Sequence, residues 1–146
     1  MRHYFLFLAT LVGLLIGCNQ NSPESSVTTL TVSDGTNQKS YDVEALKAIG
    51  AEQATFREVV YTGVPLRLLL EDAGFDPTTL SAVKATAADG FSANYDPDLV
   101  NRPDTLVAYA QSDGPLTGED GTLRMVLPDQ EGKLNPRDIV EIRIYP

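Results

Sequence analysis

The chain has 146 residues, a length that predicts one domain around a single hydrophobic core and excludes a second core of similar size. Hydrophobic residues make up 42% of the sequence and charged residues 21%, which is typical of globular proteins and not of disordered or fibrous ones. The formal net charge of -9 repels nucleic-acid phosphates, so we expect no nucleic-acid partner.

The first 17 residues have the outline of a signal peptide. Arg2 gives a basic start, and the mostly apolar run over residues 4–16 is shorter than the roughly 20 residues that a membrane-spanning helix needs. The run ends at LIGC, residues 15–18, which resembles the lipobox of bacterial lipoproteins. The resemblance implies cleavage before Cys18 and acylation of this cysteine, with palmitate as one of the acyl chains. The alternative is an ordinary secretory signal in which Cys18 is incidental.

This interpretation divides the chain into three parts. We expect a signal peptide over residues 1–17, a lipidated tether over residues 18–26 and one folded domain over residues 27–146. Cleavage would remove His3, the only histidine, and acylation would consume the only thiol. The folded part would then lack the residues for Ser-His-Asp or Cys-His nucleophiles and for zinc, haem or iron–sulfur ligation. The remaining carboxylates are scattered and form no EF-hand loop.

The first half of the domain is predicted to contain two strands and two helices. Apolar and hydroxyl residues alternate over residues 27–33, as in a half-buried strand. Asp42 is placed to cap a helix over residues 43–49. Residues 54–61 are rich in strand formers and predict one strand that ends at residues 62–63. Pro65 then opens a largely apolar helix over residues 66–73, which Gly74 ends.

The second half is predicted to be mostly strands. Residues 80–88 and 91–95 form a hairpin around a turn at Asp89 and Gly90. Three further strands are expected over residues 105–110, 123–127 and 139–145, between turn-rich segments. Short strands with helices that do not alternate regularly predict an α+β domain with mixed sheets and two or three short helices.

Six sequence pieces occur in an order that resembles the molybdopterin-binding domain of sulfite-oxidase-type oxidoreductases. They are YTGVPL at residues 61–66, LLEDAG at 69–74, ADGFS at 88–92, LVAY at 106–109, DGPL at 113–116 and LRMVLP at 123–128. The likeness covers residues 59–144, and its strength lies in the order and spacing of the pieces. It implies a single α+β domain that holds molybdopterin, with a cysteine thiolate on the metal and basic residues on the pterin phosphate.

The sequence departs from this family both at the metal-binding residue and at the residues that bind the cofactor phosphate. The resemblance places the metal-binding cysteine upstream of residues 62–65, where the chain has ATFRE at residues 54–58. None of these side chains replaces a soft thiolate. Lys133 and Arg137 match the basic pair on the cofactor phosphate, but Asp138 stands where the family usually has an aromatic residue. We therefore expect no bound cofactor, with molybdopterin as the alternative that the resemblance implies.

Five side chains are candidate ligand-binding residues: Asp89, Tyr95, Arg124, Lys133 and Arg137. All of them except Tyr95 have a structural alternative, which the sequence leaves open. The aspartate side chain often stabilises its own turn, and an arginine within an apolar strand often pairs with a carboxylate. In the structural alternative, Lys133 and Arg137 are solvated charges on a loop. The acidic run over residues 113–120 is interpreted as a solvated loop.

These observations lead to three competing functions. The first is a lipid-anchored, non-catalytic module that binds a small anionic ligand or an envelope protein, with Cys18 as the attachment to the membrane. The second is a molybdopterin-binding oxidoreductase, or a subunit of one, with an unusual metal ligand. The third is a purely structural role. Because Asn19 follows the cysteine in place of an aspartate, we expect the outer membrane, facing the periplasm, if the host has two membranes.

Overall fold

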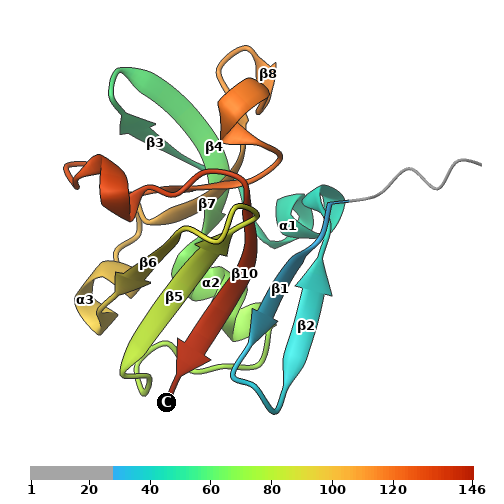
Figure 1. Ribbon diagram of the computed structural model, residues 1–146, viewed down its shortest axis with the longest axis vertical. Coiled ribbons are helices and arrows are strands. Elements are labelled where there is room, and N and C mark those ends of the chain that lie inside the picture. The colour runs from blue at the N-terminus through green and yellow to red at the C-terminus, as the bar shows by residue number, and fades with distance from the viewer. Residues whose placement is uncertain (1–27) are drawn as a thin grey trace, which may run out of the picture.

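Two five-stranded sheets form the framework of the domain, and the computed structural model describes residues 28–146 (Figure 1). The predictions for the signal peptide, Cys18 and the tether lie outside the described residues. The first sheet has the order β2 (Gln38–Tyr41), β1 (Leu30–Ser33), β10 (Ile139–Tyr145), β5 (Ala82–Ala87) and β6 (Ser92–Tyr95). Only β1 and β10 pair in parallel in this sheet, so it is mixed, as predicted.

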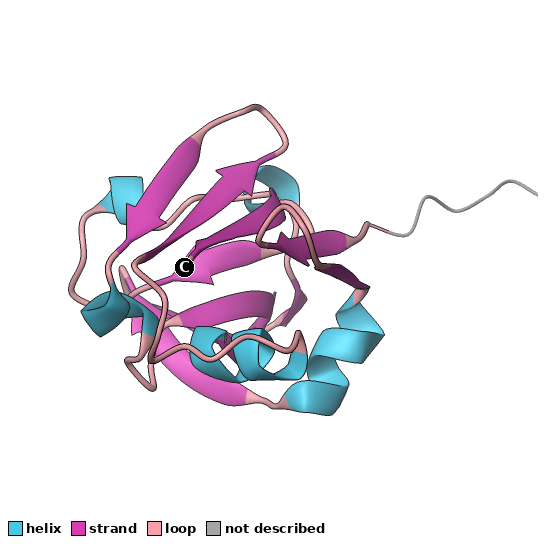
Figure 2. Cartoon of the chain, turned by 90° about the horizontal axis from the view of Figure 1, so that it is seen from below, coloured by secondary structure: helices cyan, strands magenta, loops and turns pink. Residues whose placement is uncertain are grey.

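The second sheet is antiparallel throughout. Its order is β3 (Glu52–Phe56), β4 (Val59–Pro65), β7 (Leu106–Gln111) and β8 (Gly114–Pro115), and β9 (Arg124–Val126) also pairs with β7. The two sheets with few, short helices confirm the α+β class (Figure 2).

Helices occupy the connections between the strands. In the described part of the chain, the three α-helices are α1 (Val43–Ile49), α2 (Leu66–Asp72) and α3 (Pro97–Val100), and two single 3₁₀ turns are η1 (Gly118–Asp120) and η2 (Gly132–Leu134). Helices α1 and α2 pack on β4 and on each other. No helix within residues 28–146 has the length and apolar character needed to cross a bilayer.

The predicted helix capping is observed at α1. The Asp42 side chain accepts a hydrogen bond from the Ala45 N–H at 2.7 Å, which supplies a partner for one of the free amides of the first turn. The predicted hairpin of β5 and β6 is also confirmed, with Ala85 opposite Ala93. Helix α3 begins at Pro97, and the Asp96 side chain caps it by accepting a hydrogen bond from the Leu99 N–H.

Residues 54–61 correct the sequence-based prediction, because they form a hairpin and not one strand. The chain turns at Arg57 and Glu58, whose φ angles of 48° and 69° lie in the left-handed region that glycine or asparagine usually occupies. The prediction ended this strand at residues 62–63, but β4 continues through Thr62 and Gly63 to Pro65. A two-residue turn built from a basic and an acidic residue carries no recognisable turn signal in the sequence.

Gly63 lets β4 approach β7 closely. The pairing between these strands shifts register between Thr62 and Gly63, and a Cβ atom added at Gly63 would lie 2.3 Å from the Val107 carbonyl oxygen. No side chain fits at that separation. Glycine is therefore required here by the contact between two backbones, and not by its own dihedral angles.

Strand β2 was missed by the sequence analysis because its first three residues are polar and exposed. Its position depends on β1 and on contacts with the end of α2. The Lys39 ammonium and the Tyr41 hydroxyl both donate to Asp72 Oδ2, at 2.6 and 2.8 Å. The hydrogen bond from Lys39 is the main cause of the lowered pKa of Asp72, while burial raises the pKa of Tyr41. These bonds attach the sheet edge to the helix.

Side chains are buried on both faces of the second sheet. Successive residues of a strand point to opposite faces, so Val107 and Tyr109 contact the main core, and Leu106 and Ala108 contact a second cluster. This second cluster consists of Ala54, Phe56, Tyr61, Leu106, Ala108, Leu116 and Val126. Arg124 lies on the same face of β9 as Val126 and is 3% exposed. The second cluster therefore borders a buried guanidinium.

Candidate functional site

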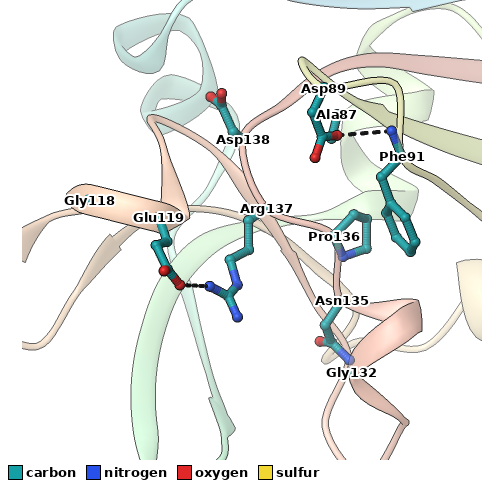
Figure 3. A pocket seen from close by; sticks show the side chains of 10 residues that line it. All are labelled: Ala87, Asp89, Phe91, Gly118, Glu119, Gly132, Asn135, Pro136, Arg137 and Asp138. Atoms are coloured by element: carbon teal, nitrogen blue, oxygen red, sulfur yellow. Dashed lines mark hydrogen bonds and ion pairs between the residues drawn. The ribbon is translucent and has the colours of Figure 1, made fainter.

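A cavity lined by two of the candidate residues, here called the principal cavity, has a volume of about 500 Å³ and lies where three connecting segments meet (Figure 3). These segments are the β5–β6 turn, the η1 turn and the chain between η2 and β10. The lining residues are Ala87, Asp89, Phe91, Gly118, Glu119, Gly132, Asn135, Pro136, Arg137 and Asp138. Two of the five sequence candidates, Asp89 and Arg137, therefore share one cavity.

Asp89 has the structural role that was its alternative interpretation. Its Oδ1 atom accepts a hydrogen bond from the Phe91 N–H at 2.9 Å, which closes the β5–β6 turn (Figure 3). The turn presents the Phe91 ring, 47% exposed, beside Pro136 in the cavity wall. Asp89 thus contributes a carboxylate to the cavity while it holds an aromatic side chain at its rim.

Arg137 pairs with a carboxylate of its own chain. The guanidinium donates to Glu119 of η1 (Figure 3). Its Nε atom lies 3.8 Å from Asp120 Oδ1. The side chain is about half exposed, so water also solvates it. In this arrangement two of the nitrogens of Arg137, Nη1 and Nε, face the carboxylates of η1.

Arg124 lies behind this pair and is almost fully buried. Its Nη1 atom donates to Asp120 Oδ1 at 2.6 Å and to the Tyr61 hydroxyl at 3.0 Å, and Nη2 donates to the Asn135 carbonyl at 3.4 Å. The guanidinium also stacks near two aromatic rings, 4.7 Å from the Tyr61 centroid and 5.5 Å from that of Phe56. All of these contacts are internal, as the structural alternative for this residue proposed.

The last two candidates, like Arg124, are not part of the cavity lining. Tyr95 is buried in the main core, and its hydroxyl donates to the Leu134 carbonyl at 3.0 Å. Burial raises the pKa of this phenol. Lys133 is exposed on η2 and pairs with Glu131 at 2.8 Å, which raises the pKa of Lys133 and lowers that of Glu131.

The charge around the principal cavity is unfavourable for an anion. Three carboxylates line it, from Asp89, Glu119 and Asp138, against the single guanidinium of Arg137. A phosphate placed here would face more negative than positive charge at short range. The backbone sets the position of the Asp138 side chain, because the φ angle of Asp138 is 50°, in the left-handed region. The side chain lies over Gly121: a Cβ atom added to Gly121 would be 2.3 Å from Asp138 Oδ1.

A second cavity of about 600 Å³ lies at the β3–β4 turn, where the family resemblance places its metal-binding cysteine. Thr55, Phe56 and Arg57 line it from the hairpin, and residues 128–132 line it from the opposite side. The oxygen and guanidinium groups of this segment do not offer a soft ligand for molybdenum. Among residues 28–146, no three His, Cys, Asp or Glu side chains are grouped to hold a metal.

The side chains of the described region therefore do not fit molybdopterin bound in the manner that the resemblance implies. The sequence after Cys18 has no thiol for the metal. The two basic residues that match the phosphate-binding pair, Lys133 and Arg137, are each paired with a carboxylate.

Sequence reasoning missed the two carboxylates that organise this region. Glu119 and Asp120 belong to the run over residues 113–120, which was interpreted as a solvated loop. The structure corrects this for Asp120, whose side chain is 17% exposed and pairs with Arg124. An i,i+4 spacing of an acid and an arginine was the only signal, and it is a weak one outside a helix.

Comparisons with known proteins agree with the fold. The family model for the oxidoreductase molybdopterin binding domain matches residues 19–146. Among solved structures, the chain is similar to the sulfane dehydrogenase SoxCD from Paracoccus pantotrophus, with a TM-score of 0.68 and 20% sequence identity. The match covers 80% of this chain and 38% of that chain, so the chain spans less than half of its length. No curated protein matches.

Proposed function

Because the chain belongs to the family of oxidoreductase molybdopterin-binding domains of the sulfite-oxidase type, we propose that it has kept the fold and lost the metal chemistry. In this proposal it acts as a non-catalytic module that binds a ligand or a protein. One observation supports the proposal most: Lys133 and Arg137, the residues that match the basic pair for the pterin phosphate, are neutralised by Glu131 and Glu119.

The positions that the chain retains are ones that serve packing. Gly63 permits the close approach of two strands, and Leu66, Leu69 and Leu70 bury α2 in the main core. Loss of a ligand residue leaves such a framework intact, because fold and chemistry depend on different side chains. The competing function, a molybdopterin-binding oxidoreductase or a subunit of one, is favoured by the description of the family.

Analysis of bound metal and pterin distinguishes these two functions. We expect less than about 0.05 molybdenum per chain, and no pterin, after expression in a host that makes molybdopterin. The physical reason is the absence of a thiolate, on which molybdenum ligation in this family depends. The measurement is elemental mass spectrometry of the purified full chain, together with the fluorescence of the oxidised pterin.

The matched control for this experiment is a molybdenum enzyme of the family produced in the same host, which must be loaded. Stoichiometric molybdenum with pterin in the present chain would contradict the non-catalytic proposal. Loss of both after substitution of Lys133 and Arg137 would then establish the oxidoreductase alternative.

We further propose that Cys18 carries a lipid that holds the domain at the cell envelope, on the outer membrane facing the periplasm if the host has two membranes. The support is the LIGC sequence at residues 15–18. Acyl chains contribute about 0.8 kcal/mol per buried methylene, so two or more give stable anchoring. The proposed partners are the membrane and an envelope protein or a small anionic ligand.

Acylation is expected to depend on Cys18 alone. The full chain should incorporate labelled palmitate, whereas the Cys18→Ser variant should not. The same chain with Ser22→Ala, a change in the tether, is the control and should be labelled like the wild type. Labelled palmitate in the Cys18→Ser variant would contradict the lipid anchor at this residue.

A further inference from the structure

The described helices leave one face of the first sheet open. Val83 of β5 and Ile142 of β10 are buried in the main core, so the alternate residues of these strands point to the opposite side, here called the outer face. Helices α1, α2 and α3 pack on the core side, where Leu46, Leu70 and Val100 are buried. Figure 1 looks onto the outer face, with β5 and β10 in front of α2.

The centre of the outer face is positively charged. Lys84 of β5 lies directly opposite Arg143 of β10 in the strand register, and both side chains are partly exposed. No ion pair within residues 28–146 includes either of them. Glu141 is the one carboxylate among the outward positions of the five described strands. Two cations against one acid make this face positive, on a chain whose formal net charge is -9.

Each cation is positioned by neighbours that are not acids. The Arg143 guanidinium lies against the β1–β2 turn, where a Cβ atom added to Gly35 would collide with Nη2. The Lys84 ammonium lies 5.9 Å from the centroid of the Tyr145 ring. Asp34, in the same turn as Gly35, uses its carboxylate to accept two backbone N–H bonds within that turn. The positive charges of the outer face are therefore held in place and left without a carboxylate partner in the described region.

This arrangement is unfavourable for the isolated domain. Like charges directly opposite each other on neighbouring strands destabilise a sheet. The two side chains diverge, with Arg143 directed toward β1 and Lys84 toward Tyr145, which lessens the repulsion without neutralising either charge. An anionic surface placed on the outer face would neutralise both.

The proposed lipid anchor brings one such surface within reach. Residues 18–26, the proposed tether, span at most about 32 Å when fully extended. They lead into β1, which belongs to the same sheet as the outer face. An anionic bilayer repels an acidic domain but attracts basic side chains near its surface. Tyr145 is 39% exposed, and tyrosine is enriched at the level of lipid headgroups.

We propose that the outer face rests on the headgroups of anionic phospholipids, with Lys84 and Arg143 against lipid phosphates and Tyr145 between the headgroups. The inference rests on the proposed lipid anchor. Each basic residue near the surface strengthens binding by only about fivefold, so the anchor must supply the local concentration. The domain then has one orientation at the membrane, with α1 and α2 on the side away from the bilayer.

Single tryptophans can report this orientation, because the chain has none of its own. The full chain is synthesised in a cell-free system and coupled through Cys18, its only thiol, to a maleimide lipid in vesicles. The vesicles contain brominated phosphatidylcholine, a quencher of tryptophan fluorescence, with or without phosphatidylglycerol. We expect quenching of the Tyr145→Trp variant to increase about twofold or more when phosphatidylglycerol is present. Quenching of Val59→Trp, in the second sheet and 37% exposed, should be the same in both vesicles.

Matched charge variants test the two cations. In the Tyr145→Trp background, Lys84→Gln/Arg143→Gln should abolish the increase. Lys47→Gln/Arg67→Gln removes two cations from α1 and α2 and should leave the increase unchanged. Thermal unfolding checks the first double variant, and its Tm should not fall because two opposed like charges are removed. If this variant does not fold, Lys84→Gln alone provides the test and should reduce the increase.

Three results would overturn the proposal. The first is equal quenching of Tyr145→Trp in both kinds of vesicle, which would favour an acidic protein as the occupant of the outer face. The second is an increase that survives the loss of Lys84 and Arg143 in a folded variant. The third is an equal increase for Val59→Trp, since the domain would then have no fixed orientation. Coupling to the maleimide lipid replaces biological acylation, so a failure of palmitate labelling would overturn the lipid anchor and leave the vesicle result standing.

Discussion

The Arg124→Met variant should lose about 3 kcal/mol of its free energy of unfolding, at the lower end of the range for breaking a buried ion pair. The substitution removes the donor to Tyr61, Asp120 and the Asn135 carbonyl, together with the cation–π contacts to Phe56. The partial exposure of Asp120 allows water to compensate in part, which limits the loss. Urea denaturation, followed by far-UV circular dichroism, measures the change.

Arg137 provides the matched control for this prediction. Arg137→Met removes an arginine on the adjacent backbone position, but its pair with Glu119 is exposed, so we expect a loss of less than about 1 kcal/mol. Replacing Asp120 by leucine in the Arg124→Met background should restore part of the stability, because no unpaired carboxylate remains. If both variants lost the same free energy of unfolding, burial of the Arg124 guanidinium would contribute nothing to stability.

Substitution of Gly63 by alanine should also cost about 3 kcal/mol, near the upper end of the cost of overpacking. The added Cβ would meet the Val107 carbonyl oxygen at 2.3 Å and the Ala108 Cα at 2.6 Å, and both are backbone atoms that cannot change rotamer. The strands β4 and β7 must therefore separate at the centre of the second sheet. Thermal unfolding of the variant should show a clear fall in Tm relative to the wild type.

A glycine with free space around it distinguishes this steric effect from a dihedral one. Gly90 has a φ of 88° and no atom within 4 Å of an added Cβ. Its replacement by alanine should cost only about 1 kcal/mol, from the left-handed backbone. If Gly63→Ala were no worse than Gly90→Ala, the close strand approach would not be a determinant of stability.

The fold was predictable where local patterns and tertiary structure agree. The helix after Asp42 has a capping residue and an apolar stripe, and the hairpin at residues 82–95 has an aspartate–glycine turn, so both were recognised from the sequence. The β3–β4 turn was not, because Arg57 and Glu58 are unusual residues in left-handed conformations. Strand β2 was missed because an exposed polar segment becomes a strand only through its partner β1.

The candidate site could be predicted only in part. Asp89 and Arg137 were identified from their motifs, and the structure places both at one cavity. The role of Asp120 could not be predicted from local sequence, because it depends on the bridge that brings Arg124 beside Arg137. Likewise, Arg124 was identified as an arginine within an apolar strand, but only the β3–β4 hairpin explains the rings of Phe56 and Tyr61 around it.

The parallel pairing of β1 with β10 has a consequence for how the protein is made. Strand β1 is the first described strand and β10 the last, so their contact, such as Val32 beside Ile142, joins residues separated by most of the chain. Strand β5 also needs β10 as its neighbour. During synthesis, the first sheet remains open until β10 leaves the ribosome, and long-range pairing of this kind slows folding. The domain should thus acquire its native structure only once β10 is available, and not while the growing chain still lacks this strand.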